Sequence, residues 1–199
     1  MVVGAIIALA LGIGVGLSGL KVQGVEFLVK NADYVLYLLM FLVGISVGLN
    51  RGIFKQMRGY GVRLAYITLG IVLGSILGGL LTGLVTGLSP REGAAIASGL
   101  GWYSLSGVML TEVAGAQVGS VAFLSNLMRE IFSFFAIPWI ARHLNYESCI
   151  APAGATSEDT TLPMMIRYTD ERTVVLSVLN GILCSALVPV LIRFCYQAL

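Results

Sequence analysis

The sequence predicts an all-α membrane protein that crosses a lipid bilayer several times. Three observations predict this class. Of the 199 residues, 57% are hydrophobic and only 11% are charged, whereas a soluble domain carries about 25% charged residues. The mean hydropathy is +0.92. Glycine, which lets transmembrane helices approach each other closely, occurs 25 times. We therefore expect the apolar stretches to form membrane spans rather than the core of a soluble domain.

The apolar stretches predict about seven transmembrane segments, at roughly 20 residues for each span. The first lacks the basic region that precedes the apolar part of a signal peptide, so we expect it to be a retained helix. The whole chain, residues 1–199, is expected to form one transmembrane domain. The seven expected segments are Val2–Leu20, Tyr34–Leu49, Val62–Leu88, Gly93–Thr111, Gly119–Ile140, Cys149–Met165 and Thr173–Tyr196.

The connection between the second and third segments is the one strongly basic loop. It contains Arg51, Lys55, Arg58 and Arg63. Cytoplasmic loops of membrane proteins are enriched in lysine and arginine, so the Arg51–Arg63 loop is expected to be cytoplasmic.

This loop sets the orientation of the remaining segments. If all seven segments cross the membrane, the N-terminus lies inside and the C-terminus outside. Arg167 and Arg172 then lie inside, in agreement with the positive-inside rule, whereas Arg142 and His143 lie outside, against it.

The third and fourth segments are separated by a helix-start signal. Ser89 is expected to cap the next helix, with Pro90 at its first position and Glu92 in its first turn.

One or two of the segments are expected to be discontinuous. The stretch Gly99–Gly107 contains three glycines and two serines, and Pro152–Thr156 contains both proline and glycine. Proline and glycine disfavour a continuous helix. Unwound backbone at membrane depth must be buried in protein or line a cavity, and we expect the backbone around Pro152–Thr156 to be non-helical and to face a polar cavity.

Glu130 is the clearest candidate for chemistry, because it lies inside the fifth segment. Asn126 precedes it by four residues and Ser133 follows it by three, so all three share one helix face. A carboxylate at membrane depth costs a few kcal/mol, so this face is expected to point to the protein interior or a water-filled cavity. The alternative is a structural ion pair, but adjacent helix positions point about 100° apart, which makes Arg129 a poor partner.

A second candidate site lies in the sixth segment. Thr156 or Ser157 is expected to cap a new half-helix with Glu158 and Asp159 in its first turn, where the helix dipole favours carboxylates. The alternative is a hydrated loop that holds an ordinary helix cap. The apolar flanks favour a site at membrane depth.

The first break offers further binding groups. Ser104 and Ser106 carry hydroxyls, and Trp102 and Tyr103 offer ring faces to a cation. For each glycine of this stretch, close helix packing is the simpler role.

Other sites are not expected. The three cysteines, Cys149, Cys184 and Cys195, have no metal-binding spacing and are expected to pack as small apolar residues. His143, at a segment end, is expected to be interfacial. No cofactor is expected, no long basic run indicates nucleic-acid binding, and no GxxxxGK[ST] motif supports an ATP-driven pump.

Several motifs, in this order along the chain, carry a resemblance to a known family. They are GLSGL at Gly16–Leu20, FLVGI at Phe41–Ile45, ASGLGWYSLSG at Ala97–Gly107 with LTE at Leu110–Glu112, Arg129–Glu130, and GATSEDTTLP at Gly154–Pro163. Together they resemble the bacterial lysine exporter family of the LysO type.

The resemblance implies a substrate and two site residues. Family members export L-lysine and its toxic analogue thialysine across the bacterial inner membrane. Two intramembrane acids are essential in the family, and the motifs place them at Glu130 and Asp159. Glu158 occupies a variable position of its motif.

The resemblance also implies a partner. Longer members carry about three further helical segments before the matched region, and some relatives are split into a small and a large chain. This chain resembles the large one. We expect it to work with a small partner membrane chain, or as a homodimer through its glycine-rich faces.

The expected mechanism is antiport, with lysine and protons competing for Glu130 and Asp159. A passive channel for cationic amino acids is one alternative, and the sequence does not separate the two. An intramembrane hydrolase is the other, because Ser104–Gly107 approaches a serine-protease GxSG pattern. It lacks the first glycine, and its candidate base is His143, which must lie within hydrogen-bond reach of the nucleophile.

Overall fold

The structure is a computed structural model, and its contacts divide the chain into two units, Met1–Ser46 and Val47–Leu199. Each unit is described by itself. The expected second segment, Tyr34–Leu49, lies largely outside the described residues, as does Arg51. The described residues are 2–18 and 53–198, together with Gly24, Phe27, Asn31, Tyr34, Leu38, Phe41, Leu42 and Ile45.

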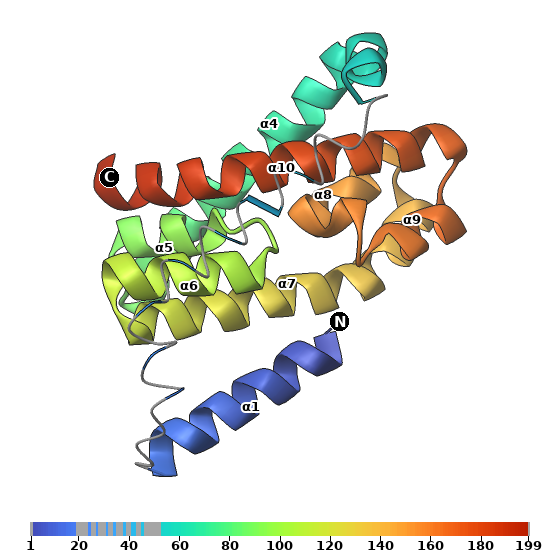
Figure 1. Cartoon of the computed structure of the whole chain (residues 1–199). Coiled ribbons are helices and arrows are strands. Elements are labelled where there is room, and N and C mark those ends of the chain that lie inside the picture. Colours follow the sequence, from blue (N-terminus) through green and yellow to red (C-terminus); the bar gives the residue numbers. More distant parts are fainter. Residues whose placement is uncertain are drawn as a thin grey trace. The chain divides into compact units, whose positions relative to one another are not determined.

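The described residues form helices, with no strand among them, which confirms the all-α prediction. The first unit contains α1 (Val2–Ser18). The second unit contains, in order, α4 (Ile53–Thr86), α5 (Pro90–Ala97), α6 (Tyr103–Ala114), α7 (Ala116–His143), η1 (Glu147–Cys149), α8 (Ile150–Ala153), η2 (Gly154–Glu158), α9 (Leu162–Tyr168) and α10 (Glu171–Ala198), where η marks a 3₁₀ helix (Figure 1).

Three helices of the described part are long and apolar enough to cross a membrane. They are Gly59–Thr86 within α4, Ala116–His143 (α7) and Glu171–Ala198 (α10), each of 28 residues. At 1.5 Å per residue, each is about 42 Å long, which exceeds the roughly 30 Å hydrocarbon core of a bilayer. They correspond to the expected third, fifth and seventh segments.

The prediction that Arg51–Arg63 is a loop is wrong for its described residues, because α4 already begins at Ile53. Lysine, glutamine, methionine and arginine are all good helix formers. The basic residues of this stretch therefore lie in a helix from Ile53 onward.

The start of α4, the end of α7 and the start of α10 meet at one end of the second unit. Arg63 Nη1 lies 2.7 Å from Glu147 Oε1, just after α7. The guanidinium of Arg172, near the start of α10, lies 6.0 Å from the ring centre of Tyr60 in α4. We call this the Glu147 end. Consequently α4 and α10 run in one direction and α7 in the other (Figure 1).

The opposite end of the unit holds the start of α5. Here Arg91 lies 5.4 Å from the ring centre of Tyr196, near the end of α10, and we call it the Arg91 end. The predicted helix start is confirmed: Ser89 is the N-cap in a complete capping box with Glu92, and Pro90 is in the first turn. The Ser89 hydroxyl and backbone N–H both donate to Glu92 Oε2, which lowers the pKa of Glu92.

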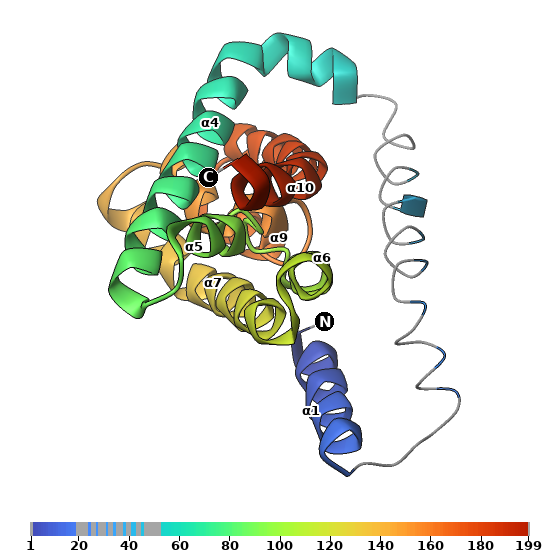
Figure 2. The same ribbon diagram turned by 90° about the vertical axis from the view of Figure 1, so that its left-hand side faces the viewer.

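The first hairpin, α5–α6, runs inward from the Arg91 end and returns to it. The connection between the two helices is residues 98–102. α6 then runs back along the first half of α7, where close glycine contacts join Gly107 to Phe123 and Gly119 to Thr111. Figure 2 shows α5 between α10 and α7, which it contacts.

The second hairpin, α8–η2–α9, runs inward from the Glu147 end and returns to it. α8 lies antiparallel to α7, with Cys149 Sγ 3.6 Å from Ile137 O and Arg129 Nε 3.0 Å from Pro152 O. α9 ends at Tyr168, three residues before α10 begins at the same end.

The structure therefore corrects the expectation that Gly93–Thr111 and Cys149–Met165 each run from one end to the other. Their chains reverse at positive backbone angles, with φ 50° at Leu100, 97° at Gly101 and 60° at Gly154. The stretch Pro152–Thr156 was expected to be non-helical. Instead, α8 ends at Ala153 and the 3₁₀ helix η2 follows. Pro152 is tolerated because it lies in the first turn of α8.

α4 packs against α5 through glycine. A Cβ atom on Gly79 would lie 2.7 Å from Ala97 Cβ and 2.9 Å from Ala94 Cα, whereas one on Gly78 would meet no described atom within 4 Å. Close approach of these helices therefore depends on Gly79 and not on its neighbour.

We predict that Gly79→Ala lowers the thermal stability of the detergent-solubilised protein, because overpacking costs about 1–3 kcal/mol. Gly78→Ala is the matched control and should not lower it, since alanine is intrinsically the better helix former by about 1 kcal/mol. Equal melting temperatures for the two variants would contradict the packing described here.

Candidate functional site

The first tip, residues 98–102 between α5 and α6, is held by Asn126 of α7. The backbone N–H of Gly101 donates to Asn126 Oδ1 at 2.8 Å. Asn126 Nδ2 donates to Ile96 O at 2.9 Å, Ala122 O at 3.0 Å and Ser106 Oγ at 3.2 Å. Asn126 and Ser106, both predicted site residues, therefore contact each other and position the tip.

The second tip, η2, is held in a similar way by Asn180 of α10. Asn180 Nδ2 lies 3.1 Å from Gly154 O and 3.2 Å from Ser157 Oγ, and Asn180 Oδ1 accepts from Thr68 Oγ1 at 2.9 Å. Asn180 and Thr68 are not among the predicted site residues. The signal that would have found Asn180 is a polar side chain in the middle of an apolar segment.

The rest of η2 lies against the same face of α10. The hydroxyls of Ser157 and Ser177 each donate to the other residue's backbone carbonyl, at 2.8 and 2.7 Å. Ser185 Oγ donates to Glu158 Oε1 at 2.8 Å. A Cβ on Gly181 would lie 2.5 Å from Glu158 Cβ. Glu158 is thus fixed on α10 and half-buried.

The two tips contact each other in the middle of the unit. The N–H of Ala155 donates to Leu100 O at 2.8 Å. A Cβ on Gly101 would lie 3.2 Å from Ala153 O, so the backbones cross with no room for larger residues. Leu100 is the one non-glycine residue with a positive φ in the described part.

Glu130 lies beside this crossing, on the face of α7 that the sequence predicted. Asn126, Glu130 and Ser133 are 2%, 0% and 0% exposed, which confirms that the face points inward. Neither carboxyl oxygen of Glu130 has a hydrogen-bond partner among the described residues. A fully buried carboxyl group without partners is costly, so it needs a proton or a cation.

The structure brings Asp159 to Glu130. Asp159 follows η2 as its C-cap and is exposed. Thr160 lies beside the Glu130 carboxyl group, and Asp159 lies within electrostatic range of it. Tyr103, the first residue of α6, lies close to both acids. The site thus combines α7 and both hairpins. Thr160 was not predicted.

Arg129 forms no ion pair with Glu130. Its guanidinium donates to Pro152 O at 3.0 Å, Ala151 O at 3.1 Å and Ser75 Oγ at 2.9 Å, which are all uncharged. Arg129 therefore ties α8 to α7 and α4. The structural pairing of these adjacent residues, weighed as an alternative, is wrong.

Other predicted residues lie away from the acids or act differently. Thr156 and Ser157 do not cap a new helix. Thr161 is the N-cap of α9, and Thr156 Oγ1 donates to Ala153 O at 2.9 Å. This expectation failed because η2 continues through Glu158. Trp102 is the N-cap of α6 without a side-chain hydrogen bond, and Ser104 is exposed.

The geometry excludes the serine hydrolase alternative. His143 stacks on Trp139, with ring centres 5.0 Å apart. Ser106 contacts Asn126, and from Asn126 to His143 the helix rises about 25 Å at 1.5 Å per residue. The candidate base is therefore far outside hydrogen-bond reach of the serines.

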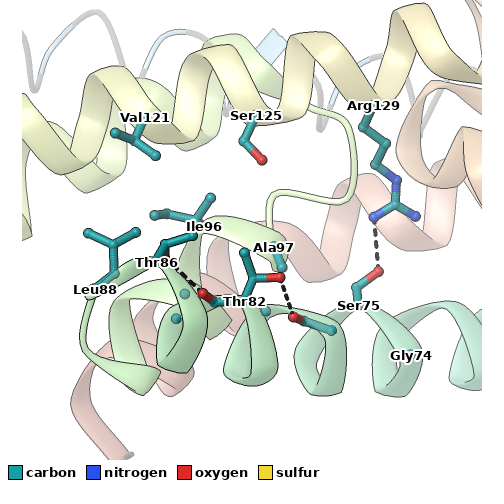
Figure 3. A pocket seen from close by; sticks show the side chains of 14 residues that line it. Gly74, Ser75, Thr82, Thr86, Leu88, Ile96, Ala97, Val121, Ser125 and Arg129 are labelled. Carbon is teal, nitrogen blue, oxygen red and sulfur yellow. Dashed lines mark hydrogen bonds between the residues drawn. The ribbon is translucent and has the colours of Figure 1, made fainter.

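A separate groove of about 560 Å³ lies between α4, α5 and α7. Figure 3 shows Arg129 reaching across its rim to Ser75. Its lining is rich in glycine, serine and threonine, and neither Glu130 nor Asp159 lines it. The groove is therefore distinct from the acid site.

Comparisons with known proteins agree on one family. The model of the family described as "Lysine exporter LysO" matches residues 6–196. The chain is 37% identical over 188 residues to the lysine exporter LysO of Escherichia coli, with 92% of this chain covered but 60% of that protein's length. It is 33% identical over 191 residues to a putative lysine exporter of Haemophilus influenzae, with 92% of both chains covered.

Both relatives are named as exporters, that is, as transport proteins. No solved structure matches the chain. The match covers nearly the whole sequence and includes the stretches that form both tips and the acid site, and the described part is helical with three helices able to cross a membrane. The chain is a membrane protein of the lysine exporter LysO family.

Proposed function

We propose that this protein exports L-lysine, and its analogue thialysine, across the bacterial inner membrane as a proton-coupled secondary antiporter. The observation that carries the proposal is the pair of neighbouring acids, Glu130 and Asp159, at the junction of two hairpin tips. Family membership supports lysine as the substrate.

The chemistry of the acid pair suits exchange. The Glu130 carboxyl group is fully buried without a hydrogen-bond partner in the described part, so it binds either a proton or a cation. A lysine ammonium group supplies a positive charge and three donors. Lysine and protons compete for the acids, and this competition couples export of one to entry of the other. Tyr103, from the first hairpin, adds a hydroxyl and a ring face to the same site.

In the membrane, α4, α7 and α10 are the crossing helices of the second unit, and the two hairpins enter from opposite sides. Their breaks are then discontinuous membrane segments. Irregular backbone is tolerated at membrane depth only where protein or a water-filled cavity surrounds it. The hydrogen bonds of Asn126 and Asn180, and the contact between Ala155 and Leu100, supply this support.

This arrangement favours the Glu147 end as the cytoplasmic side. Arg63 pairs with Glu147 at this end, and Arg142, Arg167 and Arg172 lie in helix ends there. The positive-inside rule then holds for Arg142, where seven crossings would violate it. The Arg51–Arg63 stretch remains cytoplasmic and the C-terminus remains outside.

The arrangement also favours a carrier over a passive channel. The helix groups α5–α7 and α8–α10 enter from opposite ends of the second unit, as inverted repeats do in secondary transporters. Their tips contact each other through Ala155 N–H and Leu100 O at 2.8 Å, which favours opening on one side at a time over a continuous pore.

A partner is part of the proposal. Gly70, Gly74 and Gly78 form a stripe on α4 where an added Cβ would meet no described atom within 4 Å. Small-residue stripes are preferred contact surfaces between membrane helices. The partner that packs on this stripe is a small membrane chain or a second copy of this chain.

We predict that Glu130→Gln and Asp159→Asn each lower lysine counterflow in proteoliposomes by at least about tenfold, because each variant loses a charge-assisted hydrogen bond to the lysine ammonium group, worth about 1.5–3 kcal/mol. A pH gradient should drive export by the unaltered protein only. Glu112→Gln, which neutralises an exposed acid of α6, is the matched control and should transport normally. Near-normal counterflow by either site variant would refute the assignment of that acid.

We predict that single cysteines at the two ends of α7 react on opposite sides of the membrane. In a cysteine-free background, Gln117→Cys should react with an impermeant maleimide in intact cells, and Leu144→Cys should react only after permeabilisation. Both side chains are exposed. Seven full crossings require the reverse pattern, so the experiment separates the two topologies.

A cysteine at Gln56 tests the side of the Arg51–Arg63 stretch. Gln56→Cys should stay protected in intact cells, and its labelling there would contradict the cytoplasmic position of Arg51–Arg63.

A further inference from the structure

A chain of buried hydrogen bonds links α4 to the second tip. Thr68 Oγ1 of α4 donates to Asn180 Oδ1 of α10 at 2.9 Å, and Asn180 Nδ2 lies 3.1 Å from Gly154 O and 3.2 Å from Ser157 Oγ. Thr68, Asn180 and Ser157 are 5%, 0% and 0% exposed. This chain of hydrogen bonds therefore connects α4 to η2 and α10, which follow much later in the sequence.

The bond from Thr68 helps to fix the orientation of the Asn180 amide. An amide can turn by 180°, which exchanges its oxygen and nitrogen. Thr68 as a donor fixes the oxygen toward α4 and the nitrogen toward Gly154 O. The other donor to Asn180 Oδ1 is the Cys184 thiol at 3.7 Å, which is a weak donor. Without the Thr68 hydroxyl, Asn180 Oδ1 keeps only this weak donor, and the amide is held mainly by the Gly154 O and Ser157 Oγ acceptors.

The corresponding residue of the first tip has no such dependence. Asn126 bonds with Gly101, Ile96, Ser106 and Ala122, all within α5–α7 and its first tip. Its amide orientation is therefore fixed locally, while that of Asn180 is fixed from α4.

The orientation of Asn180 affects the position of Asp159 through Ser157 and Glu158. Ser157 is bonded to Asn180 and Ser177, and Glu158 is bonded to Ser185. Asp159 follows directly, and its N–H donates to Thr156 O at 3.2 Å. The position of Asp159 beside Glu130 thus follows from how η2 is held on α10.

We propose that Thr68 and Asn180 are positioning residues of the transport site, which set the second tip so that Asp159 and Glu130 bind one cation together. This inference rests on the proposed function. Because the two residues act on the ground-state geometry of the binding site, their loss raises the KM for lysine more than it lowers kcat.

The test compares three threonine variants. Thr68→Val keeps the shape but removes the donor, and Thr68→Ser keeps the donor. Thr82→Val is the matched control on α4, because the Thr82 hydroxyl is exposed and bonds only Gly78 O of its own helix, at 2.7 Å. In proteoliposomes with equal protein, Thr68→Val should raise the lysine KM about threefold to tenfold, the effect of one hydrogen bond, with kcat within about twofold. Thr68→Ser and Thr82→Val should match the unaltered protein.

A second variant tests the hydrogen bonds that Asn180 donates to the second tip. Asn180→Asp keeps an oxygen for Thr68 but loses the donor to Gly154 O and Ser157, so its KM should rise at least about tenfold. The inference is overturned if Thr68→Val and Thr82→Val have equal KM values, or if Thr68→Val lowers kcat alone.

Hydrogen exchange separates this inference from the proposed function. The backbone amides of residues 154–159 should exchange faster in Thr68→Val than in Thr82→Val. Faster exchange in a protein that carries no lysine would refute the proposed function and leave the positioning role standing. Lysine transport by the unaltered protein, with equal exchange in both variants, would refute the positioning role alone.

Discussion

The contact between the two hairpin tips is the interaction on which the second unit depends. In the proposed membrane arrangement, each hairpin ends in backbone that no regular helix satisfies, at a depth where water is scarce. The tips satisfy part of this need themselves, through the hydrogen bond from Ala155 N–H to Leu100 O at 2.8 Å. The crossing requires Gly101 and Gly154, whose φ values are 97° and 60° and where a side chain would meet the opposite tip. Two of the three long helices, α7 and α10, are then fixed around this crossing.

A buried asparagine supports each tip, and the two supports are spaced alike in the sequence. Asn126 lies 25 residues after Gly101, and Asn180 lies 26 residues after Gly154. The similarity of spacing, together with entry from opposite ends, is the pattern of an inverted repeat. The two halves, α5–α7 and α8–α10, differ in one respect. The first tip is held by residues of α5–α7 alone, while the second hairpin is also held by α4, through Thr68 and through the bond between Arg129 and Ser75. α4 therefore contacts both hairpins, since it also packs tightly on α5 at Gly79.

The candidate site arises from the same crossing. Glu130 projects from α7 next to the first tip, and Asp159 ends the second tip, so neither hairpin alone holds the pair. The inward face of Asn126, Glu130 and Ser133 was predictable, because helical spacing places residues 126, 130 and 133 on one side. The cap expected at Thr156 or Ser157 was not realised, because the hydrogen bonds of Ser157 with Ser177 and Asn180 hold η2 as a 3₁₀ helix. Such long-range bonds leave no periodic signal in the sequence.

The sequence by itself determined the membrane class, the long helices, the capped start at Ser89 and the family. These properties are local: they follow from hydropathy, helical period, proline and glycine, and short motifs. Only the tertiary structure decided that the broken segments return to the end from which they start. A break of a few residues is equally compatible with crossing and with reversal, and the choice lies in contacts such as Arg63 with Glu147 and Ala155 with Leu100. The same holds for Asn180 and Thr68, which are 112 residues apart and become partners only when α4 and α10 pack side by side.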